Sequence, residues 1–460
     1  MAKTLSFHGG TKTVTGSNYL IETDDARILI DCGLFQGSRY NESLNFEKFA
    51  YNPVSVGAIC ITHSHADHVG RLPKLYKDGF RGAVLATEPS AAVMRVALFD
   101  TFEKMMQDAQ EGGHQPMYYR EDVEAVLQLI EPIRYDEPRS VGSLTVTFRQ
   151  SSHILGSAFV EVRIPEASGE RLLLFTGDLG NPPSAILNPI DEPSAARDVI
   201  IEAAYGNRLH EDRDERRTIL RDTILETVRA EGTLMIPSFA IERTQEILLE
   251  LEELFSTGQI PNTIPVFVDS PLAIHITEVY SKFSNYMNAG AVQTLEKYGG
   301  LFSFPWLTFT HTVEQSKGIN NVSGPKIIIA GSGMSQGGRI LHHETRYLPD
   351  AKSTILFVGY QVQGSLGRRI LDKEPHVTIF GQLVPVKCRV KAIGGYSAHA
   401  DQQGLMDFLK RIHAQGNLSR VFVVQGEPDA VTALSERITS ELGVEAFCPD
   451  QGASFPLDEK

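Results

Sequence analysis

The stretch from Gly57 to Gly70, which reads GAICITHSHADHVG, constrains the fold of this chain more than any other. Its first half is a short apolar run rich in β-branched residues, which fits a buried strand better than a helix of that length. Residues two apart in an extended chain point to the same side, so His63 and His65 can present their imidazoles to one point. Asp67 and His68 follow as the chain turns and face a second point nearby. This density of imidazole and carboxylate ligands predicts a zinc site at the end of a strand.

Similar polar residues follow three further predicted strands. The strand-like runs 27–31, 143–150 and 171–176 lead to Asp31, His153 and Asp178, respectively. We therefore expect these side chains to converge on one edge of a sheet sandwich. A lone His153 would more often be a satisfied core histidine, but the presence of His63 and His65 favours a metal ligand.

The length and composition of the chain indicate an ordinary globular protein with two compact units. Its 460 residues exceed a typical single core, and no apolar run approaches the ~20 residues needed to cross a bilayer. The four cysteines are isolated in the sequence, which fits reduced thiols, so we expect a cytoplasmic protein. The formal net charge of −14 repels polyanions, so any nucleic acid must be held by a local basic patch.

The sequence pattern changes near Asn207, where strands begin to alternate with helices. Such alternation indicates βαβ units and a parallel sheet. We expect this second domain to end near Glu374 and to be followed by a hairpin of 377–380 with 386–393. The predicted organisation is a first domain over 1–207, an inserted domain over 208–375, and a return to the first domain over 376–460.

The grouping of Asp31, HSHADH at 63–68, His153 and Asp178 resembles the metal site of the metallo-β-lactamase fold. Further stretches resemble the β-CASP branch of that superfamily, which includes ribonuclease J and the nuclease subunit of the pre-mRNA 3′-end cleavage complex. These are IIEAAYGNR at 200–208, GSGMSQGGRILHH at 331–343, FVGYQVQGSLGRRI at 357–370 and GYSAHAD at 395–401. The resemblance covers essentially the whole chain. It implies an α/β fold: a four-layer αββα sandwich with an inserted parallel α/β domain.

The resemblance also implies a site with two zinc ions. One zinc would be held by His63, His65, His153 and Asp178, and Asp178 would bridge to a second held by Asp67 and His68. Asp31 would orient a ligand imidazole through its other ring nitrogen.

The chain departs from the family pattern at Gln425. RNA-cleaving members carry a histidine that completes the second zinc site there, whereas this chain reads VFVVQGE. A glutamine carbonyl is a poorer zinc ligand than an imidazole. The second site is therefore expected to be weaker or differently occupied.

The implied reaction is hydrolysis of single-stranded RNA. Zinc lowers the pKa of bound water from 15.7 to about 7, which supplies a metal-bound hydroxide at neutral pH. The family motifs fall on Glu202 and on His399, our candidate for the acid that protonates the leaving oxygen. Without the resemblance, a solvated carboxylate and a turn histidine would be the better interpretations of these two residues. The resemblance implies products with a 5′-phosphate and a 3′-hydroxyl.

RNA phosphates could be bound by the glycine-rich loop Gly331–Gly338, which lies between a predicted strand and a predicted helix. Backbone N–H groups in such a loop can face a phosphate, although a flexible connection is the plain alternative. The side-chain candidates are Ser332, Ser335, Ser397 and Arg339. The expected partner is single-stranded RNA rather than a membrane, and the resemblance makes a homodimer plausible.

Three hypotheses about function follow. The first is an active zinc-dependent ribonuclease in which Gln425 weakens the second metal site. The second is an RNA-binding paralogue with little or no activity, for which Gln425 is the only sequence support. The third is a hydrolase of small esters or lactams, against which the inserted domain argues because a small substrate needs no such clamp.

Overall fold

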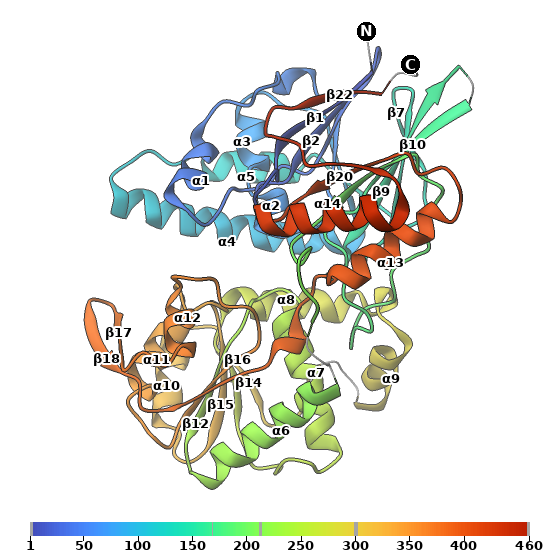
Figure 1. Cartoon of the computed structure of the whole chain (residues 1–460). Coiled ribbons are helices and arrows are strands. Elements are labelled where there is room, and N and C mark those ends of the chain that lie inside the picture. Colours follow the sequence, from blue (N-terminus) through green and yellow to red (C-terminus); the bar gives the residue numbers. More distant parts are fainter. Residues whose placement is uncertain (1–2, 168, 211–213, 299–301, 458–460) are drawn as a thin grey trace. The chain divides into compact units, whose positions relative to one another are not determined.

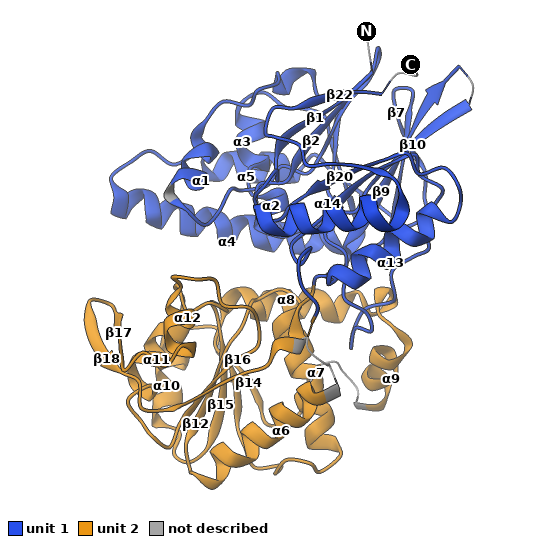
Figure 2. Cartoon of the chain, viewed as in Figure 1, with its two compact units in different colours: residues 1–209, 399–460 blue, residues 210–398 orange. Residues whose placement is uncertain are grey.

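The computed structural model describes residues 3–457 except 168, 211–213 and 299–301. The chain divides into two compact units (Figure 2). Unit 1 comprises residues 1–209 and 399–460, and unit 2 comprises residues 210–398. No described helix combines the length and the apolar character needed to cross a membrane.

Unit 1 contains two seven-stranded sheets (Figure 1). The first has the order β22-β1-β2-β3-β4-β5-β6 and the second the order β21-β20-β11-β10-β9-β8-β7. The first sheet is built from β1 (Thr4–Gly9), β2 (Asn18–Glu22), β3 (Arg27–Ile30), β4 (Ala58–Cys60), β5 (Ala83–Thr87), β6 (Ile130–Ile133) and β22 (Ser454–Pro456). The second is built from β7 (Arg139–Val141), β8 (Leu144–Gln150), β9 (Ala158–Glu166), β10 (Gly169–Phe175), β11 (Asp198–Glu202), β20 (Arg420–Val424) and β21 (Glu445–Phe447).

Apolar side chains bury both faces of each sheet. One core cluster joins β1–β3 to β8–β10, with Phe7 and Phe148 among its members, and so lies between the sheets. The outer face of the first sheet is covered by α2 (Ala66–Val69), α3 (Leu72–Lys77), α4 (Glu88–Gly112) and α5 (Arg120–Leu127). The outer face of the second is covered by α13 (Gln402–His413) and α14 (Pro428–Leu442). The predicted αββα sandwich is therefore confirmed.

Strand direction sets where the loops of the second sheet meet. β9 is antiparallel to both β8 and β10, so β8 and β10 run the same way. β10, β11 and β20 are parallel neighbours. The carboxyl ends of β8, β10, β11 and β20 therefore lie at the same edge of the second sheet. In the first sheet, β3 and β4 are also parallel to each other.

Unit 2 is built around a six-stranded parallel sheet with the order β14-β13-β15-β12-β16-β19. The strands are β12 (Thr233–Pro237), β13 (Val266–Val268), β14 (Leu307–Phe309), β15 (Lys326–Ala330), β16 (Thr354–Phe357) and β19 (Arg389–Ala392). The main helices are α6 (Asp214–Arg229), α7 (Arg243–Ser256), α8 (Pro271–Lys282), α9 (Ala289–Tyr298), α10 (Val313–Gly318), α11 (Ile340–Tyr347) and α12 (Leu366–Leu371). The inserted parallel α/β domain is thus confirmed. The sequence pattern after Asn207 predicts a helix over 211–230; α6 is present from Asp214, and residues 211–213 lie outside the described ones.

The predicted hairpin of 377–380 with 386–393 is wrong in its second arm. β17 (His376–Ile379) pairs with β18 (Gln382–Pro385), because Phe380 and Gly381 both adopt positive φ and turn the chain within two residues. β19 instead joins the parallel sheet beside β16. This pairing keeps residues 376–398 in unit 2, so the chain returns to unit 1 at His399 rather than at the expected residue 376.

Candidate metal centre

Four side chains from three loops of unit 1 converge on one point. His63 and His65 follow β4, His153 follows β8, and Asp178 follows β10. The chain can place two histidines here because β4 stops at Cys60 and α2 starts only at Ala66, which leaves an extended segment between them. One ligand atom from each of the four residues lies within 4.8 Å of the others. The structure thus brings together the four predicted ligands of the first zinc.

The spacing of the ligand atoms fits a tetrahedral zinc ion. His63 Nε2 and His153 Nε2 lie 3.0 and 3.2 Å from His65 Nδ1. Each of those Nε2 atoms is 3.4 Å from Asp178 Oδ2. Four ligands about 2.0–2.1 Å from a tetrahedral zinc would be about 3.3–3.4 Å apart. The donor set therefore fits zinc in both chemistry and size.

Electrostatics keeps these imidazoles in the form that binds a metal. Burial, followed by the charge of neighbouring histidines, lowers the pKa of His63, His65 and His153. Neutral imidazoles are the ligand form, since a metal needs the nitrogen lone pair. Burial opposes ionisation of Asp178, but the surrounding histidines outweigh it and hold the pKa of this carboxyl well below its usual range.

A second group of side chains surrounds His68, beside this cluster. The Asp31 carboxylate is fully buried and lies 2.7 Å from His68 Nδ1. It also accepts hydrogen bonds from the Thr62 backbone N–H at 2.8 Å, from the Thr62 hydroxyl at 2.9 Å and from the Ser17 hydroxyl at 3.1 Å. Asp31 adopts a positive φ of 60°, a conformation that aspartate tolerates better than most residues. Asp31 thus contacts the His68 ring, and its role in orienting a metal ligand stays a prediction.

Gln425 occupies the space where the predicted second metal would be. It follows β20 with a φ of 49°, and its backbone N–H donates to the Gly10 carbonyl. Its side-chain Nε2 lies 2.9 Å from His68 Nε2 and donates to Asp178 Oδ1 at 3.2 Å. The Tyr19 hydroxyl lies 3.4 Å from the other end of the amide, Oε1. The carboxamide therefore contacts two of the expected ligands of a second metal.

The protonation of His68 decides which end of the amide faces it. A neutral His68 that donates from Nδ1 to Asp31 can accept the Gln425 N–H at Nε2. Burial favours this neutral form, but the carboxylates of Asp178, Asp31 and Asp67 outweigh burial and raise the pKa of His68. A protonated His68 would favour the reversed amide, in which Oε1 accepts from His68 Nε2 and the hydrogen bond from Nε2 to Asp178 Oδ1 is lost. In both states the carboxamide fills the same space, and Asp67 Oδ2 lies 3.8 Å from His68 Nε2.

Glu202, which is fully buried, and His399, which is partly exposed, form a pair beside Asp178. His399 Nδ1 lies 3.2 Å from Glu202 Oε2 and 3.8 Å from Asp178 Oδ2. Glu202 is the last residue of β11 and also accepts the backbone N–H groups of Leu179 and Ala204, at 2.8 and 3.3 Å. Burial lowers the pKa of His399, but the carboxylates of Glu202 and Asp178 outweigh it and raise that pKa to about 9. At neutral pH His399 therefore holds a proton next to the cluster.

The predicted phosphate-binding side chains lie in unit 2, where the structure gives several of them internal partners. Ser335 is fully buried and donates to Glu344, and the Ser332 hydroxyl accepts the Gln336 backbone N–H at 2.9 Å. The Arg339 guanidinium donates to Asp269 Oδ1 at 2.8 Å and to the Thr310 carbonyl at 2.9 Å. Ser397 lies two residues before the return to unit 1. Binding of RNA by these residues stays a prediction.

Asp269 is the centre of a polar network that sequence reasoning missed. It follows β13, is fully buried, and accepts bonds from Thr310 and Ser316, each at 2.6 Å. His343 Nε2 lies 2.7 Å from its second oxygen. The signal was present, because a carboxylate directly after an apolar strand is the pattern that identified Asp31 and Asp178.

Comparison with known proteins places this geometry in a family. Three family models match successive parts of the chain: the metallo-beta-lactamase superfamily over residues 12–237, the Beta-Casp domain over 244–370, and the Zn-dependent metallo-hydrolase RNA specificity domain over 383–449. Ribonuclease TTHA0252 of Thermus thermophilus is 37% identical over 429 residues, which cover 93% of this chain and 94% of that protein. The chain belongs to the β-CASP family of metallo-β-lactamase-fold ribonucleases.

Two further relatives of this β-CASP protein carry different names. The RNase J-like protein of Methanocaldococcus jannaschii is 30% identical over 458 residues, which cover 98% of this chain and 99% of that one. The transcription termination factor FttA of Methanosarcina mazei is also 30% identical, over 455 residues that cover 95% of this chain and 69% of the factor. The resemblance inferred from the motifs is thus confirmed.

Proposed function

We propose that this β-CASP protein is a metal-dependent nuclease that hydrolyses phosphodiesters of single-stranded RNA and leaves a 5′-phosphate and a 3′-hydroxyl. The observation that carries the proposal is the tetrahedral spacing of four ligand atoms from His63, His65, His153 and Asp178, with the His399–Glu202 pair beside them. The family, and the name ribonuclease given to its Thermus thermophilus member, support RNA as the substrate.

The metal would be held by the four residues of the cluster. Zinc, when bound there, lowers the pKa of a coordinated water to about 7 and so provides a nucleophile at neutral pH. Asp31 contributes indirectly, because its carboxylate contacts His68. The carboxylate also accepts a hydrogen bond from the Thr62 hydroxyl, which in turn lies 3.2 Å from His63 Nδ1. Fixed ligand rings keep the site from having to reorganise during the reaction.

His399 is our candidate for the group that protonates the leaving oxygen. Glu202 engages its Nδ1, so the proton that is donated would come from Nε2. The backbone of His399 forms an isolated β-bridge with Gly180, two residues after Asp178, which fixes the distance between this acid and the metal cluster. Glu202 is a positioning residue in this scheme, because its carboxylate touches His399 and two backbone N–H groups.

We further propose that the protein works with one tightly bound metal. A second metal at Asp67, His68 and Asp178 would have to displace the Gln425 amide from contacts of 2.9 and 3.2 Å. The lost contacts are worth about 0.5–1.5 kcal/mol each, and the carbonyl oxygen gained in exchange is a poor zinc ligand. Occupancy of the second position should therefore be weak.

Gln425 also supports a second candidate function, an RNA-binding paralogue without activity. A chain that has lost the reaction would bind RNA and leave it intact at every metal concentration. The active form is supported by the grouping of His63, His65, His153 and Asp178, by the contact of Asp31 with His68 and by the His399–Glu202 pair.

The experiment that tests the proposal is cleavage of a labelled single-stranded RNA, compared with a DNA of the same sequence and with duplex RNA. We expect cleavage of the single-stranded RNA alone, its loss on chelation, and its recovery with zinc. The matched control is His153→Ala, which removes one ligand of the cluster, beside His413→Ala, which changes a histidine at the end of α13. RNA binding without cleavage in the zinc-loaded protein, or faster turnover of a thioester than of RNA, would contradict the proposal.

A further inference from the structure

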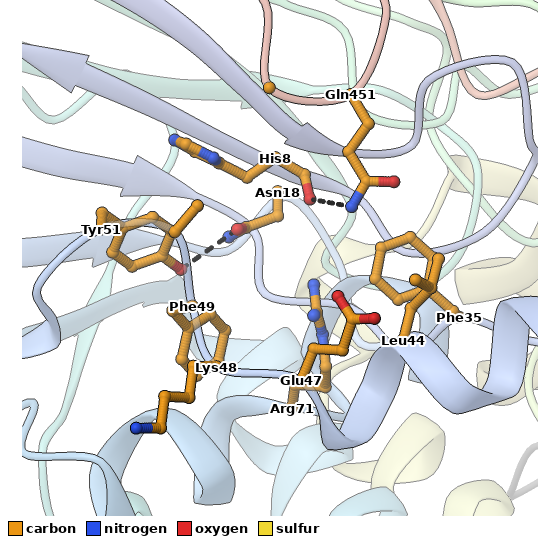
Figure 3. A pocket seen from close by; sticks show the side chains of 12 residues that line it. His8, Asn18, Phe35, Leu44, Glu47, Lys48, Phe49, Tyr51, Arg71 and Gln451 are labelled. Carbon is orange, nitrogen blue, oxygen red and sulfur yellow. Dashed lines mark hydrogen bonds between the residues drawn. The ribbon is translucent and has the colours of Figure 1, made fainter.

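A cavity in unit 1 is lined by residues that the proposed reaction does not use (Figure 3). It lies beside the amino-terminal strands β1 and β2 and has a volume of about 140 Å³. That is roughly ten times the space that one water molecule needs. The lining residues that carry the argument are His8, Asn18, Lys48, Phe49, Tyr51 and Arg71.

Arg71 is a buried cation that forms no ion pair with a described carboxylate, although Glu47 also lines the cavity. Its side chain is only 5% exposed, and its Nε donates to the Gly33 carbonyl at 2.6 Å. The guanidinium carbon lies 4.5 Å from the ring centre of Phe35 and 5.3 Å from that of Phe49. Among the described residues, nothing accepts a hydrogen bond from its buried Nη2. Because a buried charge is costly unless it is paired and hydrogen-bonded, Nη2 calls for an acceptor.

Lys74 also lies against Phe49, but unlike Arg71 it forms an ion pair. Its ammonium lies 4.3 Å from the ring centre of Phe49 and pairs with Asp78 Oδ2 at 2.7 Å. No described carboxylate forms such an ion pair with Arg71. The cavity also has the exposed Lys48 on its lining, with Glu47 as the acidic residue there. The three cations Arg71, Lys74 and Lys48 outnumber the two carboxylates Asp78 and Glu47. The local charge is therefore positive, although the whole chain carries −14.

His8 adds a second unpartnered polar group. Both of its ring nitrogens are buried without a hydrogen-bond partner among the described residues. Its ring packs edge-to-face on Tyr51, with 4.9 Å between the ring centres. Burial, followed by the charge of Arg71, lowers the pKa of His8 to about 4, so the ring is neutral at pH 7. A neutral imidazole offers one donor and one acceptor, which suits a ligand that carries both oxygens and hydroxyl groups.

We propose that this cavity binds a small oxyanion, either inorganic phosphate or the phosphate of a free nucleotide. Arg71 would donate to the anion through Nη2, His8 would add a neutral N–H, and Lys48 would contribute charge at the rim. The aromatic rings of Phe49 and Tyr51, whose centres are 5.3 Å apart, leave an apolar wall for the remainder of a nucleotide. This site is separate from the metal cluster and does not depend on the proposed reaction.

The cavity is connected to the metal centre through side-chain and backbone hydrogen bonds. Asn18, which lines it, accepts from the Tyr51 hydroxyl at 3.1 Å and donates to the Asp31 carbonyl at 2.7 Å. The Arg71 backbone N–H donates to the Cys32 carbonyl at 2.9 Å, and the Cys32 N–H donates to the His68 carbonyl at 2.8 Å. These hydrogen bonds link residues around the cavity to Asp31 and His68.

The test is titration calorimetry of the full chain with inorganic phosphate and, separately, with adenosine monophosphate. Chelated protein is used, so that a phosphate bound to metal cannot contribute. We expect saturable binding of one anion per chain, weakened at least tenfold by Arg71→Lys, which keeps the charge and loses the planar fork. Lys48→Met, at an exposed position, should weaken binding two- to fivefold.

The matched control is Arg81→Met, which removes an exposed arginine that lies 3.8 Å from the ring centre of Tyr76 in the same unit. It should bind the anion as the wild type does. Saturation by both ligands supports an oxyanion site, and saturation by the nucleotide alone supports the same site with a contribution from its base or sugar. The proposal is overturned if neither ligand binds to the chelated wild type, or if Arg81→Met weakens binding as much as Arg71→Lys.

Discussion

Asp31 contacts His68 but is not one of the four ligands of the cluster. Replacing it therefore tests the support of the metal centre while all four ligands stay unchanged. Asp31→Asn keeps the shape of the side chain and tolerates the positive φ of 60°. It loses the negatively charged acceptor that lies 2.7 Å from His68 Nδ1. A hydrogen bond to a charged group is worth about 1.5–3 kcal/mol, so we expect unit 1 to lose about 2–3 kcal/mol of stability.

Asp31→Ala should cost much more. It removes the same acceptor, leaves the buried Thr62 backbone N–H without a partner, and puts alanine, which tolerates a left-handed conformation less well than aspartate, at a positive φ. An orphaned donor costs about 1–3 kcal/mol and the backbone conformation about 1–2 kcal/mol. Together with about 2–3 kcal/mol for the lost acceptor, the total is roughly 4–8 kcal/mol, which approaches the whole stability of many domains.

The assay is urea unfolding followed separately in the two units. The single tryptophan, Trp306, lies in unit 2 and reports that unit by fluorescence, whereas hydrogen exchange of β3 and β4 peptides reports unit 1. Asp31→Asn should lower only the stability of unit 1 and should keep its zinc, because His63, His65, His153 and Asp178 are unchanged. Loss of zinc to the extent seen in His153→Ala, or equal destabilisation by asparagine and alanine, would refute this account of Asp31.

Two further predictions concern single side chains. His399→Gln should lower RNA cleavage by about 10²–10⁴-fold and leave the zinc content unchanged. Single-turnover kinetics and metal analysis would check the two quantities. Loss of zinc together with activity would make His399 a ligand instead. Burial raises the pKa of Glu344 to about 8 from 4.5, so the contribution of this carboxyl to the stability of unit 2 is greatest below pH 4.5 and falls as the pH rises towards 8. Glu344→Gln removes this dependence and should stabilise unit 2 above pH 8 by an amount on the order of 4 kcal/mol, measured by Trp306 fluorescence; an unchanged pH profile would contradict it.

Local sequence signals predicted much of the fold. The predicted strands 27–31 and 143–150 are present as Arg27–Ile30 and Leu144–Gln150, because each is a short run rich in apolar residues that lies beside a turn. The second arm of the hairpin after residue 376 was predicted wrongly. Its turn is set by two residues with positive φ, and the composition of the segment does not show that they adopt this conformation. The ligands of the cluster were predicted because each follows a strand.

Contacts between distant positions could not be predicted in the same way. Gln425 was identified as a departure from the family pattern, but its contact with Tyr19 spans 406 positions. Arg339 was expected to contact RNA, and nothing in its surrounding sequence indicated Asp269, which lies 70 positions away. The unpaired Arg71 is likewise visible only in the folded chain, because the absence of a carboxylate depends on which loops surround it.

The measurement that tests the central claim most directly is zinc content and RNA cleavage, determined on the same samples of wild type and Gln425→His. The account predicts that the wild type holds about one zinc per chain and cleaves single-stranded RNA, while the histidine variant holds two. A wild type that is inert with zinc bound, beside a Gln425→His variant that cleaves, would contradict the account and identify a disabled nuclease. Two tightly bound zinc ions in the wild type would contradict the role given to the Gln425 amide.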